Sequence, residues 1–72
     1  MLELARIIIE NYCQTHNTKK AARLARLVDK SYDLSFERTD DDAIYLEGLI
    51  KREKNPELKE ALQELDDFLF GY

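Results

Sequence analysis

Residues 55–71 read NPELKEALQELDDFLFG and give the clearest helical signal in the chain. Asn55 is a favourable N-cap and Pro56 suits the first helical position, so a helix is predicted over 56–70, with Gly71 marking its end. Its apolar residues recur at i, i+3, i+4, i+7, i+10 and i+11, the spacing of a helix that buries one face. These residues are Leu58, Ala61, Leu62, Leu65, Phe68 and Leu69.

Three more helices are predicted, over 2–14, 18–32 and 40–54. The polar residues 15–18, THNT, separate the first two, because short polar side chains favour turns and helix caps. The third has a strong start signal, since Thr39 can cap it and three aspartates follow directly in its first turn. Negative charge there interacts favourably with the helix dipole.

The local signals together favour helices over strands. The chain has only two glycines and one proline, and no segment alternates β-branched and polar residues. We therefore predict an all-α fold, a compact four-helix unit built from two αα-hairpins, with residues 1–72 as a single small helical domain. Leu34 and Phe36, in the loop between the hairpins, are expected to pack back onto the core.

Composition limits the class of protein. The chain of 72 residues is 44% hydrophobic and 36% charged, which is too apolar for a disordered segment and too charged for a membrane span. With one cysteine and no readable signal peptide, we expect a cytoplasmic protein. A core of this size supplies roughly 3–5 kcal/mol, so a partner often adds to the stability of such a domain.

Two of the predicted helices have more apolar surface than one contact layer covers. In the helix over 2–14, a core-facing side is clear, but Leu4, Ile7 and Ile8 extend the apolar arc around the other side. In the helix over 40–54, Ile44 and Tyr45 point away from the main apolar face. These five residues either mark central helices of the bundle or form a groove for a protein partner or a second copy.

The aromatic residues at the C-terminal end are a second candidate contact. Phe70 points away from the apolar face of its predicted helix, and Tyr72 lies beyond the helix end. They form either a partner-binding surface or a cap that folds back over the bundle.

Charge is distributed unevenly along the chain, whose net charge is −4. Residues 1–36 have six basic and four acidic side chains, whereas residues 37–72 have five basic and eleven acidic ones. Two rows have helical spacing: a cationic row expected to face solvent, and an anionic row on the last helix. Both are either ordinary solvated faces or charged rims that select a partner. The rows are Lys19, Arg23, Arg26 and Lys30, and Glu57, Glu60, Glu64 and Asp67.

The sequence contains no grouping typical of catalysis. His16 is the only histidine and lies in a predicted turn, while Cys13 lies on an apolar helix side, as expected for a structural thiol. Asp40, Asp41 and Asp42 are explained by a helix start, and no glycine-rich phosphate loop is present. We therefore expect no enzyme activity, no cofactor and no metal site.

These features favour a small non-catalytic regulator, adaptor or inhibitor that acts through protein–protein binding, and we expect it to self-associate as a homodimer. The alternative is a helix-turn-helix DNA-binding protein that uses 18–32 as its recognition helix, with Lys19, Lys20, Arg23 and Arg26 on the outer side. The net charge of −4 counts against a nucleic-acid partner, because phosphate repels acidic surfaces.

Overall fold

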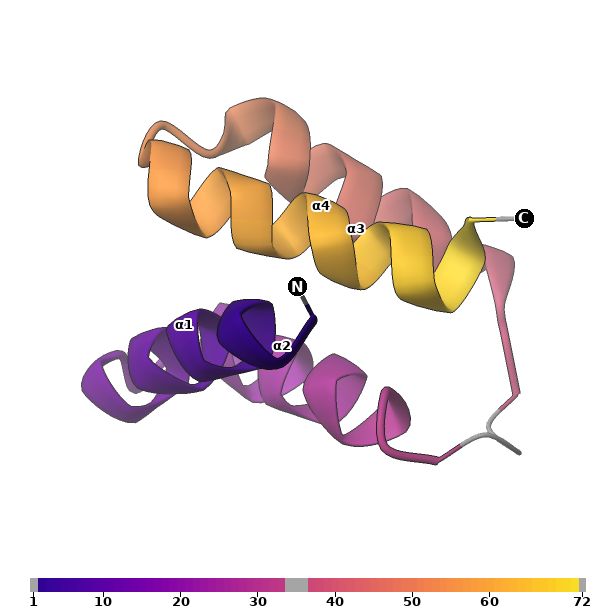
Figure 1. The fold of residues 1–72 in the computed structure, drawn as a ribbon, viewed down its shortest axis with the longest axis horizontal. Coiled ribbons are helices and arrows are strands. Elements are labelled where there is room, and N and C mark those ends of the chain that lie inside the picture. Colours follow the sequence, from indigo (N-terminus) through magenta and orange to yellow (C-terminus); the bar gives the residue numbers. More distant parts are fainter. Residues whose placement is uncertain (1, 34–36, 72) are drawn as a thin grey trace.

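The computed structural model describes residues 2–33 and 37–71. This part of the chain contains four α-helices and no strand, so the predicted all-α class is confirmed (Figure 1). The helix ends agree with the predicted ones to within two residues. The helices are α1 (Leu2–Thr15), α2 (Lys19–Lys30), α3 (Asp40–Arg52) and α4 (Pro56–Phe70). The predictions for Leu34, Phe36 and Tyr72 fall outside the described residues.

Side-chain caps begin three of the helices. The Thr18 Oγ1 atom accepts a hydrogen bond from the Ala21 amide at 3.1 Å, and Thr39 Oγ1 accepts one from the Asp42 amide at 3.3 Å. At the start of α4, Asn55 Oδ1 accepts two backbone hydrogen bonds, 2.9 and 3.2 Å long. Because these caps satisfy amides that have no partner within their helix, they set where α2, α3 and α4 begin.

The four helices form two antiparallel hairpins that pack on each other. Figure 1 shows α1 and α2 as one hairpin, α3 and α4 as the other, and α1 lying along α4 in the opposite direction. The α1–α4 contact joins the hairpins, and α3 lies diagonally opposite α1. The core is almost entirely aliphatic and includes side chains from all four helices. Its members are Ala5, Ile9, Leu24, Leu27, Val28, Leu46, Leu49, Leu58, Ala61, Leu62, Leu65 and Leu69.

A second connection between the hairpins is polar and joins α2 to α3. Lys30 Nζ lies 2.6 Å from one carboxylate oxygen of Asp42, and Arg23 Nη2 lies 3.5 Å from the other. The Arg23 guanidinium also lies 3.9 Å from the centre of the Tyr45 ring, a cation–π contact. Lys20 pairs with Glu53 at 3.6 Å near the other end of the two helices.

These contacts of Lys20, Arg23 and Lys30 with α3, which we call the α2–α3 seam, correct the expectation that the whole cationic row faces solvent. Arg23 and Lys30 contact Asp42 of α3 and are half-buried, whereas Lys19 and Arg26 are exposed. The physical reason is that helical spacing places the four cations on one side of α2 but does not reveal which helix packs there. Tyr45, which was expected to point away from the main apolar face of its helix, is half-buried because it packs against the core beneath Arg23.

Within residues 2–33 and 37–71, none of the helices combines the length and apolar character that a bilayer crossing requires.

Candidate protein-binding surface

Large apolar side chains remain exposed on several helices of the described chain. On α1, Leu4 is 59% and Ile7 54% exposed, although Ala5 and Ile9 on the same helix are fully buried. The helix is therefore covered on one side and leaves branched aliphatic residues in water on the other. The remaining exposed large hydrophobic side chains of the described residues are Tyr32, Ile44 and Phe68.

A groove between α1 and α4 combines this apolar surface with carboxylates. Its apolar part comes from Leu4, Ile8 and the methyl group of Ala61. Its α4 wall consists of Glu57, Glu60 and Glu64, which are on successive turns of one helix face. The volume is about 290 Å³, at the lower limit for a small-molecule site, so this α1–α4 groove suits side chains of a protein partner better.

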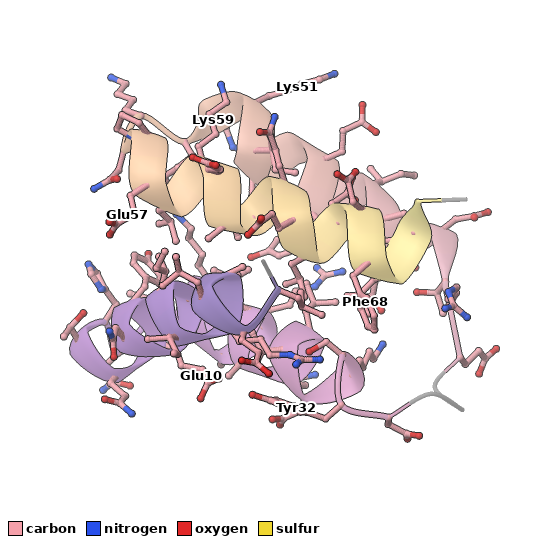
Figure 2. The ribbon with its side chains drawn as sticks, viewed as in Figure 1. Glu10, Tyr32, Lys51, Glu57, Lys59 and Phe68 are labelled. Carbon is pink, nitrogen blue, oxygen red and sulfur yellow. The ribbon has the colours of Figure 1, made fainter. Side chains whose placement is uncertain are left out.

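The α4 side of the groove is acidic. Glu57 and Glu60 are exposed, and neither forms an ion pair with another residue of the described chain. Figure 2 shows Glu57 pointing from the start of α4 toward α1, and Lys59 on the side of α4 away from α1. No basic residue lines the groove.

Arg6 organises the neighbouring surface on the α2 side of α1. Its Nε atom donates to Ser31 Oγ at 2.8 Å, and its Nη2 atom donates to the Ser31 main-chain oxygen at 2.6 Å. The guanidinium also lies 4.1 Å from the centre of the Tyr32 ring and 5.8 Å from that of Phe68. Tyr32 in turn donates from its hydroxyl to a Glu10 carboxylate oxygen, 3.2 Å away.

The Arg6 contacts join the start of α1 to the end of α2 and to α4, and Figure 2 shows Tyr32 and Phe68 on this side of the bundle. Ile7 and Tyr32 border a shallow depression here, together with the charged residues Glu3 and Arg6. Sequence reasoning missed this cluster. Arg6 and Ser31 are 25 residues apart, and neither local spacing nor composition signals such a contact.

The structure brings together only part of the predicted partner-binding set. Leu4, Ile7 and Ile8 share one surface of α1, but Ile44 is 68% exposed on α3, which does not border that surface. The α1 and α3 residues of the set therefore lie on separate helices of the described part. Phe70 is half-buried and packs against the core, in line with the capping alternative. Of the anionic row, three residues line the α1–α4 groove, and Asp67 does not.

The two side chains considered above for catalysis, His16 and Cys13, both contact nearby residues of the fold. His16 stacks on Tyr12 with ring centres 4.0 Å apart, and its Nδ1 atom lies 2.9 Å from the Tyr12 main-chain oxygen. The Cys13 thiol donates to the Ala21 main-chain oxygen at 3.2 Å. Burial, together with the negative charge of Glu10, raises the pKa of the Cys13 thiol, which disfavours the reactive thiolate. The described residues contain no group of three side chains able to hold a metal ion.

No known family model matches this chain, and no curated protein or solved structure is significantly similar to it. The function is therefore argued from the structure alone. Its main features are four helices in the described residues, an exposed apolar surface on α1 and an acid-lined groove between α1 and α4.

Proposed function

We propose that this protein is a non-catalytic binding module that takes a helix of another protein into the α1–α4 groove. The observation that carries the proposal is the exposure of Leu4 and Ile7, 59% and 54%, at and beside a groove with an apolar floor. A contiguous apolar surface with a polar rim is typical of protein interaction sites. A regulator, adaptor or inhibitor works through such a surface.

The form of the groove supports a helical partner. It runs between two antiparallel helices, and Leu4 and Ile8 present apolar side chains one turn apart. An amphipathic helix has apolar residues at the same i, i+4 spacing, so its side chains can pack between those of α1 and α4. A helix also satisfies its own backbone hydrogen bonds and needs no strand edge from this protein.

The charges of the groove support a different protein over a second copy. A twofold-symmetric dimer uses the same patch on both subunits. A dimer through the α1–α4 groove would therefore place Glu57, Glu60 and Glu64 of both copies in one interface. Like charges brought together in this way oppose association.

The helix-turn-helix alternative has less support. It requires Lys20 and Arg23 on the outer side of α2, whereas Lys20 pairs with Glu53 and Arg23 contacts Asp42 and Tyr45, all on α3. Of its four cations, Lys19 and Arg26 are exposed, whereas Lys20 and Arg23 are half-buried.

The proposal is tested by nuclear magnetic resonance with two synthetic helical peptides that share leucines at i, i+4 and i+7. One has glutamine and the other lysine on its polar side. We expect chemical-shift changes to cluster at Leu4, Ile8 and Ala61 with at least one peptide. Leu4→Glu should abolish binding and keep the fold, because Leu4 is 59% exposed.

Ile44→Glu is the matched control, since Ile44 is 68% exposed but lies on α3. Equal loss of binding in both variants, shifts on another face, or no binding of either peptide contradicts the proposal. Sedimentation of the unmodified chain tests the competing occupant. A concentration-dependent dimer that Leu4→Glu disrupts would show that a second copy covers the groove.

A further inference from the structure

We propose that a second copy of this chain binds the outer face of α3, so that two α3 helices pair in opposite directions around a twofold axis. The outer face is the side of α3 opposite its buried residues Leu46 and Leu49. It is separate from the α1–α4 groove, so this inference goes beyond the proposed function and does not depend on it. The residues that form the pairing are Asp40, Asp41, Ile44, Gly48, Lys51 and Arg52.

The outer face has an apolar protrusion beside a notch. Ile44 is 68% exposed, the highest value among the large hydrophobic side chains of the described residues. Gly48 follows one turn later on the same side of the helix and has no side chain, so another backbone can approach it closely. A second α3 that runs in the opposite direction presents its notch to the protrusion of the first, and its protrusion to the notch.

This fit sets the register of the pair. With Ile44 of each copy opposite Gly48 of the other, the residues three and four positions before Ile44 lie level with those three and four positions after Gly48. The former are Asp40 and Asp41, and the latter are Lys51 and Arg52. Because a twofold axis repeats every contact, the acidic start of each α3 meets the basic end of the other.

Charge complementarity identifies the occupant as a second copy in the opposite direction. The first turn of α3 is acidic and its last turn is basic, so a parallel pair would bring like charges together at both ends. Lys51 is available for a contact between copies. Its side chain is 74% exposed although it pairs with Glu47 at 3.2 Å, and Figure 2 shows it extending from α3 away from the α1–α2 hairpin.

Two side chains change their surroundings on pairing. The end of the Arg52 side chain lies over Gly48, where a methyl group would be 3.2 Å from Nη1. Because this end is flexible, it can move to Asp41 of the second copy while Ile44 fills the notch. The Glu47 side chains of the two copies approach each other near the twofold axis, so Glu47→Gln should strengthen the association.

Sedimentation equilibrium from low micromolar to millimolar concentration tests the pairing, because a face on one short helix forms a small and weak interface. We expect a monomer–dimer equilibrium. Ile44→Glu should weaken the association roughly a hundredfold, since each dimer buries two Ile44 side chains. Leu4→Glu is the matched control. Leu4 is 59% exposed but lies on α1, so this variant should associate like the wild type.

Gly48→Gln separates a loss of association from a loss of fold. Glutamine is a better helix former than glycine, so the monomer should unfold at a higher temperature than the wild type. The same side chain fills the notch, so the variant should associate more weakly. Circular dichroism at low micromolar concentration measures the thermal unfolding of the monomer.

Single charge reversals test the direction of the pairing. Asp41→Lys and Arg52→Glu should each associate weakly alone, because their dimers contain two like-charge contacts. An equimolar mixture should recover the association, since the new lysine then faces the new glutamate and Arg52 faces Asp41. Both variants keep a net negative charge, so attraction between oppositely charged chains does not explain recovery.

The controls for these reversals make the same changes of charge on α2. Asp29→Lys and Lys19→Glu, both at exposed positions, should each associate like the wild type.

The outcomes separate this inference from the proposed function. A chain that stays monomeric at millimolar concentration, a dimer that Ile44→Glu leaves intact, or a mixture that fails to recover overturns the pairing of α3. A dimer that Leu4→Glu disrupts also overturns it, because the second copy would then lie on α1. Peptide binding to the α1–α4 groove is measured separately and can succeed or fail whatever the result for α3.

Discussion

Lys30 Nζ lies 2.6 Å from Asp42 Oδ2, so the last residue of α2 is tied to the first turn of α3. Asp42 also accepts from Arg23 at 3.5 Å, and its own amide donates to the Thr39 cap. One carboxylate thus joins the two hairpins on the side away from the apolar α1–α4 contact. The Asp42 side chain is only 16% exposed, so these interactions are partly shielded from solvent.

Asp42→Asn should destabilise the fold by about 1–2 kcal/mol, because hydrogen bonds to charged groups contribute more than neutral ones. Asp41→Asn is the matched control. Asp41 lies in the same first turn, so it has a similar interaction with the helix dipole, but it is exposed. Urea unfolding followed by circular dichroism measures both free energies of unfolding. Equal losses in the two variants would show that the α2–α3 seam contributes nothing.

Asp42 also gives the stability a dependence on pH. The hydrogen bond from Lys30 is the main cause that lowers the pKa of Asp42 below its ordinary value, with further contributions from Thr39 and Arg23. A carboxylate with a lowered folded-state pKa stabilises the fold above its unfolded pKa of about 3.9. The contribution disappears as the pH falls through the folded-state pKa. The difference between the wild type and Asp42→Asn should therefore shrink below about pH 4.

Arg6→Ala should lower the free energy of unfolding by about 1–3 kcal/mol, because it leaves a buried main-chain acceptor without its charged donor. Ser31, whose main-chain oxygen is that acceptor, is 2% exposed. Arg6→Lys should restore only part of the loss, since an ammonium group cannot donate in the planar fork geometry that reaches Ser31 Oγ and O together. Thermal unfolding of the three proteins measures this order. If Arg6→Lys restored the full wild-type stability, the contribution of Arg6 would come from its charge alone.

The two sides of α1 should respond differently to the same substitution. Ile9→Ala removes a fully buried side chain and should cost about 2–5 kcal/mol. That loss is comparable to the whole stability of roughly 3–5 kcal/mol expected for a chain of this length, so the variant should be partly unfolded. Ile7→Ala, at a position that is 54% exposed, should change stability by no more than about 0.5 kcal/mol. A large loss for Ile7→Ala in urea unfolding would mean that this surface is covered.

Asp66→Asn should stabilise the protein at neutral pH by up to about 0.5 kcal/mol, the usual range for surface substitutions. Burial raises the pKa of Asp66, and the charges of Asp67 and Glu47 add to the effect. The charged carboxylate therefore opposes folding above its folded-state pKa, and wild-type stability rises as Asp66 becomes protonated. The advantage of Asp66→Asn should vanish below about pH 4, near the unfolded pKa. A constant advantage at all pH values would contradict an electrostatic cause.

The anionic row shows how sequence and structure each contribute to the candidate site. Spacing alone indicates that Glu57, Glu60 and Glu64 share one side of a helix, and the structure places them in that way. Spacing does not indicate that this side borders Leu4 and Ile8, which lie about fifty residues earlier in the chain. The interpretation of the row as a solvated face or as a rim therefore depended on which helix packs against α4.

The helix positions follow from the sequence because their causes are local. Caps at Thr39 and Asn55, and apolar residues three and four positions apart, act within one or two turns and can be read from neighbouring residues. The partners of each face are decided by contacts between distant segments: Arg6 with Ser31, Lys30 with Asp42, and Leu4 across from Glu60. Such contacts depend on how the two hairpins pack. Only the tertiary structure could therefore separate the apolar residues of α1 into core and exposed surface.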